Sequence, residues 1–511
     1  MAIETNVNDL AAANDRSPTH DAPRRSFLTA TASAAILAGF ASRLRAQTSL
    51  PPPAPVPWTP DLELRFLVDR ISNGWNPEIY ARAVQLGYDA FLEEQLAPAS
   101  IADPIVAPMM PQYPTVSLTT KQIYDQYVAP GNVATVMLEF RTATIVRAIY
   151  SKRQLFERMV EFWSDHFSVD LADGQVQWLK TAEDRDVIRA NALGRFRDLL
   201  IGDAKSAAML YYLDNYRNFS TAPNENYSRE VMELHTLDVG NYTETDVSEL
   251  ARCITGWQFR NSSFANAGDF FFNAAQHDNG QKTVRGQVIS PGGVTEGETV
   301  LTSLASDVAT ARFVTGKLCR FFLAYNPPQA VLDAVAIAYR VSGGDIKTVV
   351  RKMFERNTLH MMDPASIVKI KRPFHLVNSV VRALNPTVAQ PNRFVQELTT
   401  MGHLPFAWSA PDGYPDTAQA WGTSVLDRWN FVSRFFSESI TGVGVNVTKI
   451  FGPVQKNLLA SHANRVLMGG RMAPEDVTAV QAYADAATTL NDTLRREVLA
   501  LAASTPSFQT Y

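Results

Sequence analysis

The chain of 511 residues contains only two cysteines, Cys253 and Cys319, and neither belongs to a CxxC pair. This scarcity excludes a disulfide-rich scaffold and a CxxC redox or zinc motif. Both cysteines lie in apolar segments, so we expect buried free thiols. The sequence also lacks a GxSxG elbow, an HExxH zinc motif, a P-loop, a GxGxxG loop and a CxxCH haem site. These absences argue against the enzyme classes that the motifs define.

The sequence has no excess of positive charge. It contains 47 Lys and Arg against 51 Asp and Glu, a net charge of −4. A nucleic-acid-binding protein would carry a clustered basic surplus, so that class is disfavoured. Beyond the N-terminal region, no apolar run reaches the roughly 20 residues that a membrane helix needs. We therefore expect a soluble mature protein without a membrane span.

The N-terminal region contains Arg24 and Arg25, followed by an uncharged, Ala-rich run over 29–40. This pattern predicts a twin-arginine signal peptide over 1–46, and hence a periplasmic or secreted protein. An ordinary secretory signal or a retained anchor is the alternative. Because twin-arginine export carries folded proteins, a cofactor or an exported partner would explain the route. The Pro-rich stretch 47–60 is expected to be an extended spacer.

The apolar periodicity of the remaining chain predicts a mainly helical, all-α fold with one compact core, formed by a single domain over 61–511. Strand-like alternation is scarce. Asp269–Asn273 and Lys282–Val288 could pair as a small β-hairpin within a long loop, 257–300. Helices are expected over 62–71, 77–96, 132–150, 152–164, 183–192, 195–210, 225–238, 244–255, 306–324, 328–341, 345–355, 365–384, 392–401, 423–438 and 475–502.

Several sequence blocks occur together in one known family. They are NENYSREVMELHTL over 224–237, GNYTETDV over 240–247, EFWSDHF over 161–167, KRPF over 371–374 and PDGYP over 411–415. Over about 62–436 the chain resembles the bacterial family catalogued as domain of unknown function 1800. The resemblance implies an exported, mainly helical protein. It also implies a sulfatase-like exported partner and work on the envelope or on polysaccharides, without assigning an activity.

The segment 225–238, placed on a helix at 100° per residue, brings Arg229, Glu230 and Glu233 onto one narrow polar stripe. Carboxylates are rarely buried without a partner. Glu230 and Glu233 are therefore candidate metal ligands or an acid/base pair, and Arg229 a candidate for holding an anionic group. The alternative is an ion-pair network in which Arg229, Arg252 or Lys180 fastens two helices.

Two histidine–aspartate pairs complete the candidate site. Asp165-His166 ends an apolar helix. His166 is a candidate metal ligand and Asp165 the carboxylate that orients it or acts as a base. The alternative is that His166 caps the helix C-terminus. His277-Asp278 lies in the long loop, where such a pair is commonly turn chemistry. His166, Glu230, Glu233 and His277 together would suit a divalent transition-metal ion. Asp165, Glu230 and Arg229 are the candidate catalytic residues.

One further pattern has a structural interpretation, and two others have both a structural and a functional one. Thr243 and Asp246 predict a capping box, which is structural. The aromatic residues around Asp412-Gly413, which are Trp408, Tyr414 and Trp421, would either stack on sugar rings or pack in the core. Lys369, Lys371 and Arg372 would either hold an anion or form a solvated helix start.

The first functional hypothesis is a metal-dependent hydrolase acting on an envelope or polysaccharide substrate, with a polar or anionic carbohydrate-type ligand. The second is a non-catalytic helical binding or assembly partner of another exported enzyme. A ferritin-like oxidative metal site is the third. It is disfavoured because Glu230-x-x-Glu233 has glutamate where that motif needs histidine.

Overall fold

The computed structural model describes residues 57–511. The predicted signal peptide, and the predicted spacer up to residue 56, lie outside the described residues. The first helix, α2, spans Pro60–Ile71, and the Thr59 side chain caps it by accepting a hydrogen bond from the Leu62 backbone. The folded helices therefore begin where the predicted spacer ends.

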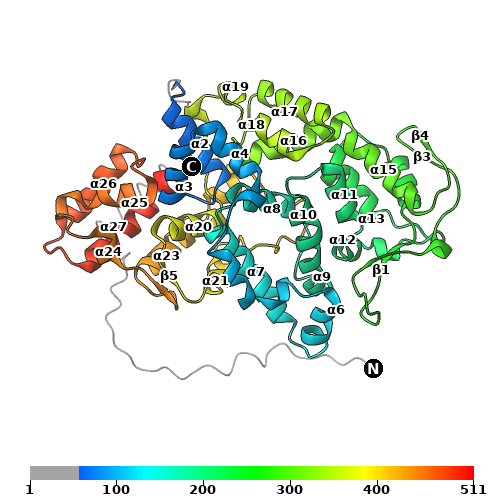
Figure 1. Ribbon diagram of the computed structural model, residues 1–511, viewed down its shortest axis with the longest axis horizontal. Helices are drawn as coiled ribbons and strands as arrows, with labels where there is room; N and C mark the ends of the chain where they lie inside the picture. The colour runs from blue at the N-terminus through cyan, green and yellow to red at the C-terminus, as the bar shows by residue number, and fades with distance from the viewer. Residues whose placement is uncertain (1–56) are drawn as a thin grey trace.

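The fold is mainly helical, as the sequence predicted (Figure 1). After α2, the helices are α3 Pro77–Leu86, α4 Tyr88–Leu96, α5 Val106–Met109, α6 Thr120–Ile123, α7 Val133–Tyr150, α8 Gln154–His166, α9 Val176–Glu183, α10 Arg189–Asn191, α11 Phe196–Ala204, α12 Ala207–Tyr212, α13 Asn226–Glu230, α14 Glu244–Cys253, α15 Val294–Ser306, α16 Val308–Phe322, α17 Gln329–Ser342, α18 Ile346–Phe354, α19 Arg356–Leu359, α20 Pro373–Leu384, α21 Arg393–Thr400, α22 Ala418–Gly422, α23 Val425–Phe436, α24 Val447–Phe451, α25 Leu459–Met468, α26 Pro474–Ala486, α27 Asp492–Ser504 and α28 Pro506–Gln509. Within residues 57–511, no helix is both long and apolar enough to span a membrane.

Glycine and proline account for two errors in the predicted helix boundaries, whereas the predicted helices 195–210 and 475–502 are divided at Ser206 and Asn491, which are the N-caps of α12 and α27. The predicted helix 77–96 is two helices, because Gly87 has φ of 78° and ends α3. The predicted helix 365–384 begins only at Pro373, whose fixed φ suits the first turn of α20. The helices α15 and α25 were not predicted.

The long loop contains two hairpins instead of the one that was predicted. The strand β1 (Trp257–Phe259) pairs antiparallel with β2 (Phe270–Phe272), and β3 (Lys282–Val284) pairs with β4 (Gln287–Ile289). The predicted pairing of 269–273 with 282–288 is therefore wrong, although both segments contain strands. A third short pair joins β5 (Thr387–Val388) to β6 (Val443–Gly444).

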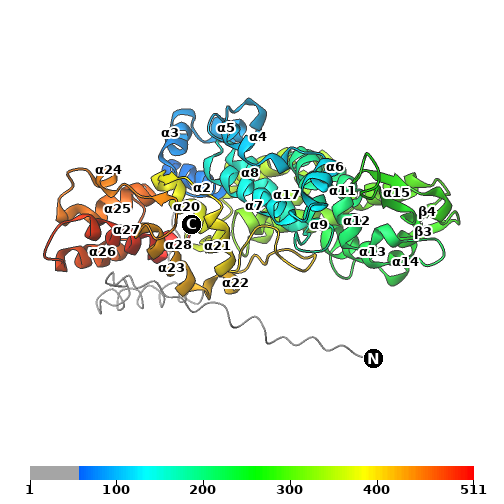
Figure 2. The same cartoon turned by 90° about the horizontal axis from the view of Figure 1, so that it is seen from below.

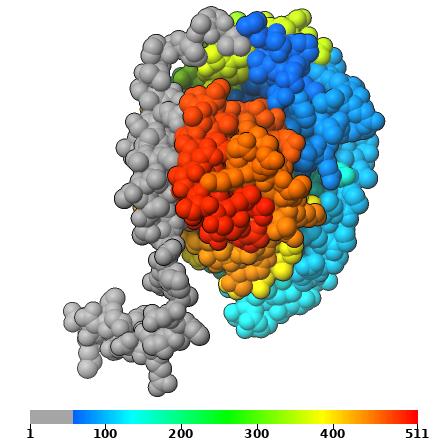
Figure 3. Space-filling model, turned by 90° about the vertical axis from the view of Figure 1, so that its left-hand side faces the viewer, coloured from blue at the N-terminus to red at the C-terminus, as the bar shows by residue number. Residues whose placement is uncertain are grey.

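The molecule is elongated, with α24–α27 at one end and the hairpins at the other (Figures 1 and 2). Its buried apolar side chains form two large clusters. One draws on α2–α4 and α8–α18, and the other on α7, α20, α21 and α23–α27. Figure 3 shows the C-terminal end, where the orange and red C-terminal helices lie beside the blue N-terminal ones. Both cysteines are buried and free.

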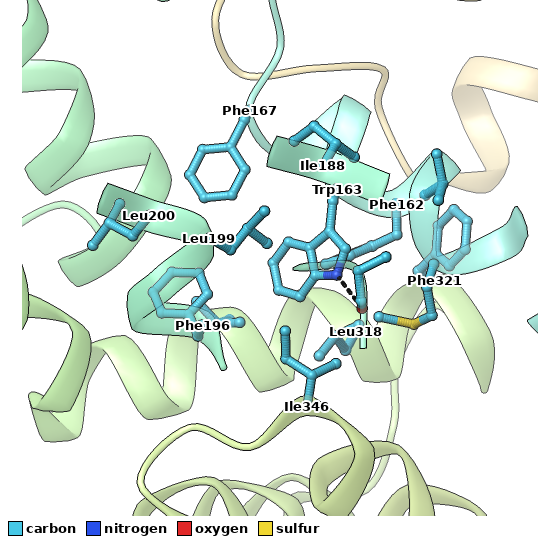
Figure 4. Packing of buried hydrophobic residues seen from close by; sticks show 14 of the residues in the cluster. Phe162, Trp163, Phe167, Ile188, Phe196, Leu199, Leu200, Leu318, Phe321 and Ile346 are labelled. Carbon is cyan, nitrogen blue, oxygen red and sulfur yellow. Dashed lines mark hydrogen bonds between the residues drawn. The ribbon is translucent and has the colours of Figure 1, made fainter. Parts of the chain in front are cut away.

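The C-terminal half of α8 is fixed by a dense aromatic core (Figure 4). Trp163 is fully buried, and its indole nitrogen donates to the Ala192 carbonyl at 3.0 Å. Its ring lies 4.8 Å from that of Phe162 and 5.8 Å from that of Phe196. Tight packing of this kind leaves side chains little freedom. The core therefore holds the next residues, Asp165 and His166, in fixed positions.

Candidate functional site

The segment over 225–238 is helical, but only its first part is an α-helix. The helix α13 ends at Glu230, and Val231–Leu237 continues as a π-helix. The Thr236 hydroxyl donates to the Val231 carbonyl at 2.5 Å. A π-helix has more residues per turn, so the predicted stripe at 100° per residue is wrong beyond Glu230. Such segments occur frequently at functional sites.

The predicted polar stripe splits between two environments. Arg229 points outward and makes a two-pronged ion pair with Glu244 of α14, at 2.8 and 2.6 Å. The pair joins α13 to α14 at the surface and does not involve Glu230 or Glu233, so it is not the predicted internal network. The Tyr242 hydroxyl donates to Glu233 at 2.5 Å. Burial and the neighbouring Glu233 carboxylate raise the pKa of Glu230, and Asp412 acts in the same direction.

His277 belongs to a polar cluster that fastens the long loop. Its Nδ1 lies 2.9 Å from the Thr255 carbonyl and its Nε2 lies 3.0 Å from Glu296. Lys282 donates to the other Glu296 oxygen at 2.5 Å, and the backbone N–H groups of Gly292 and Gly293 donate to the first. The fully buried Glu296 carboxylate therefore has four donors. This arrangement satisfies its polar groups and fixes the loop.

His166 is buried at the end of α8, among aromatic rings. Its Nε2 donates to the His235 carbonyl at 3.1 Å. Its ring lies 4.6 Å from that of Phe167. Burial, with a smaller contribution from nearby Lys317, lowers the pKa of His166 well below its usual value. The imidazole is thus neutral, and the alternative of a cationic cap at the helix C-terminus is wrong.

The four predicted metal ligands do not converge on one site, although Glu230 and Glu233 are neighbours. His166 binds a backbone carbonyl, His277 belongs to the Glu296 cluster and Glu233 accepts from Tyr242. Over residues 57–511, no group of three or more His, Cys, Asp or Glu side chains is arranged to hold a metal ion. A divalent metal therefore stays a prediction from the sequence, without a ligand cluster in the described chain.

A pocket of about 330 Å³ lies between α8, α16 and the loop over 411–417, and one predicted ligand, His166, is among its lining residues. Six of the lining side chains are charged in a mixed pattern: Asp165, Asp412 and Asp416 are acidic, and Lys317, Arg320 and Arg372 are basic. Leu234 joins the lining from the π-helix. The family-like blocks that the sequence separates by more than 240 residues thus meet at one pocket.

One glycine allows the loop over 411–417 to close against α8. Gly413 has φ of 75°, and a Cβ built on it would lie 2.0 Å from the Asp165 carbonyl oxygen. A side chain is excluded at that distance, and the positive φ also favours glycine. The sequence indicated a turn at Asp412-Gly413. The structure shows that this turn is one wall of the pocket.

Arg372 joins the two acidic sides of the pocket. Its guanidinium donates to Asp165 at 2.7 Å and lies 3.4 Å from Asp416. Lys369 donates to Asp416 at 2.9 Å. Arg372 precedes Pro373, which restricts it to an extended backbone. The start of α20 thereby directs the guanidinium to Asp165.

The cationic triplet before Pro373 is not a solvated helix start, so that interpretation is wrong. Lys369, Lys371 and Arg372 are all buried. Burial lowers the pKa of Lys369 and of Lys371 to about 7. Burial raises the pKa of Asp416, but Lys369 and Arg372 outweigh it and hold that pKa below its usual value.

Asp165 and Lys317 have pKa values displaced toward neutrality. Burial raises the pKa of Asp165 to about 6, against the opposing effect of Arg372. Burial lowers the pKa of Lys317 to about 8, against the opposing effect of Asp165. Only one Asp165 oxygen, Oδ2, has a hydrogen-bond partner within residues 57–511. Displaced values in a cleft are typical of acid/base groups.

Lys317 and Arg320 are pocket residues that sequence reasoning missed. The Lys317 ammonium lies 5.5 Å from the Phe313 ring, and neither side chain makes an ion pair or hydrogen bond with another described residue. The available signal was the recurrence of cations in a helix without acidic residues, which also contains Arg312. The aromatic surface is mostly core: Tyr414 and Trp421 are buried and pack with half-buried Trp408.

The fold and the pocket define a class: a helical protein with a charged pocket at which separate sequence blocks converge. The chain belongs to the family described as Protein of unknown function (DUF1800), which residues 66–510 match. The match extends beyond the predicted 62–436 and includes α24–α27. No curated protein and no solved structure matches the chain.

Proposed function

We propose that this chain is an exported envelope enzyme that acts on a polar, anionic, carbohydrate-type substrate. The reaction takes place in the pocket between α8 and α16. One observation carries the proposal: Asp165 has a free oxygen at the pocket and a pKa of about 6, and it lies beside Lys317, an ammonium without an ion pair.

The reaction class that suits these groups is hydrolysis by acid–base chemistry. Asp165 exchanges a proton near neutral pH and so can take one from water or give one to a leaving oxygen. Lys317 and Arg320 favour negative charge on the substrate. Arg372 positions Asp165 through the 2.7 Å ion pair. Each role belongs to a residue that lines the pocket.

A screen of aryl glycosides, glucuronides, sulfate esters and phosphate esters tests the proposal. We expect hydrolysis of an anionic member, with a rate that depends on a group of pKa near 6, and loss of that dependence in Asp165→Asn. Hydrolysis that is unchanged in Asp165→Asn, or absent for every member, would contradict it.

The second candidate function is a binding or assembly protein without catalysis. It is favoured by the engagement of the other two pocket carboxylates: Asp416 pairs with Lys369, and Asp412 accepts from the Trp408 indole at 2.7 Å. Ligand binding without turnover, abolished by Lys317→Met, would select this function. Co-purification with an exported sulfatase-like protein would support the predicted partner.

A further inference from the structure

A second cavity lies beside the pocket on α16. Its volume is about 480 Å³, and Leu237, Asn241, Arg285, Arg312 and Arg320 are among its lining residues. Phe313 and Arg320 line both cavities. The two cavities are therefore neighbours on α16, and their combined space exceeds what one small ligand would fill.

Three cations of α16 face these cavities without a partner. Arg312, Lys317 and Arg320 make no ion pair with any other described residue. Arg312 and Arg320 are eight residues apart, which is about 12 Å along a helix axis. Cations without a protein partner along one helix face favour a ligand with several separated anionic groups.

Three cations and two acidic residues line the second cavity, so its charged side chains leave a surplus of one positive charge. Asp307 is paired with Arg285 at 2.7 Å. One Asp238 oxygen accepts from the Val239 backbone at 2.9 Å. Arg285 is thus neutralised, whereas Arg312 and Arg320 are not. The second cavity remains suited to an anion.

The residues that line the pocket also favour one kind of anion over another. Phe313, Phe321 and Tyr414 place aromatic rings beside the isolated charges. A polyphosphate is charged over its whole surface and gains little from such rings. Sugar units have apolar C–H faces together with separate carboxylate or sulfate groups, and they match a mixed wall better.

We propose that the two cavities form one extended groove for an acidic oligosaccharide. One unit lies beside Asp165 and Lys317, and the anionic group of a neighbouring unit lies between Arg312 and Arg320. This inference rests on the proposed function for its reacting unit, but the groove is tested by binding alone.

The test is calorimetric titration of the purified protein with galacturonate, digalacturonate and tetragalacturonate. A second arm uses sulfated oligosaccharides of matched length, and neutral malto-oligosaccharides are the reference. We expect affinity to rise from single units to oligomers for one acidic series. Arg312→Gln should remove at least about tenfold of the gain with length and leave single-unit binding unchanged, because a charge-assisted contact exceeds the ~1.4 kcal/mol that corresponds to a tenfold change.

Arg340→Gln is the matched control, because Arg340 is exposed on α17 and has no ion pair within residues 57–511. It should bind every ligand as the wild type does. The groove is overturned if neither acidic series binds more tightly with length, or if Arg312→Gln and Arg340→Gln behave alike. Length-dependent binding without turnover would support the groove and contradict the enzyme. Turnover without length dependence would support the enzyme and contradict the groove.

Discussion

Two polar regions of this protein, one buried and one half-buried at a pocket, differ in how completely their charges are satisfied. In the His277 cluster, Glu296 receives His277, Lys282 and two backbone N–H groups. In the pocket between α8 and α16, Lys317 and Arg320 have no ion pair with any described residue, and one Asp165 oxygen is free. A satisfied cluster fixes structure, whereas an unsatisfied one with space beside it can bind a ligand.

The largest expected effect is on stability, at the satisfied cluster. Glu296→Gln removes the carboxylate nearest to Lys282 and should lower the free energy of unfolding by about 3–5 kcal/mol, because the buried ammonium then keeps, among the described residues, only the 3.9 Å ion pair with Asp278. Urea denaturation measures this. Glu298→Gln is the control: it breaks the more exposed pair with Lys205 and should cost less than about 1 kcal/mol. Equal losses would remove the contrast between the two regions.

The next effect concerns the close approach of the loop over 411–417 to α8. Gly413→Ala places a Cβ against the Asp165 carbonyl and enforces a left-handed backbone on alanine. We expect a loss of about 3 kcal/mol in stability and weakened ligand binding, because the loop over 411–417 must move away from α8. Gly240→Ala tests positive φ alone, since its Cβ would meet nothing within 4 Å. Comparable losses in both variants would show that the close approach to α8 is unimportant.

A smaller effect concerns the pH dependence of stability. The pKa of Asp165 is raised from 3.8 to about 6, so its stabilising contribution is complete below pH 3.8 and is lost as pH rises through 6. The free energy of unfolding of wild type should therefore fall relative to Asp165→Asn, by on the order of 2 kcal/mol between pH 4 and pH 7. Parallel curves for the two proteins would contradict the burial of an ionisable Asp165.

The smallest effect is expected at Glu230 and Glu233, for which the sequence predicted a role as metal ligands. The paired substitution Glu230→Gln/Glu233→Gln removes two neighbouring carboxylates and should change stability by less than about 1 kcal/mol. Elemental analysis of protein from the export compartment should find the same metal content in variant and wild type. A stoichiometric metal that only the variant loses would restore the metal centre and make this region the functional one.

The sequence predicted the helical fold well because apolar periodicity reports burial directly. It missed what depends on distant contacts. The π-helix after Glu230 changed which side chains share a face, and the hairpin strands pair with partners that no local pattern identified. Asp165, a candidate from the sequence, lines the pocket, and its role there stays a prediction. Lys317 was missed, because an unpaired cation is recognised only when the carboxylates around it have been located in space.

The most direct test of the central claim is the affinity of wild type and Lys317→Met for digalacturonate between pH 5 and pH 10. An anion binds best when Lys317 is charged and Asp165 is neutral. Wild-type affinity should fall as pH rises through about 6, and again through about 8. Lys317→Met should bind more weakly and keep only the first fall. Identical affinities and identical pH profiles would contradict the account.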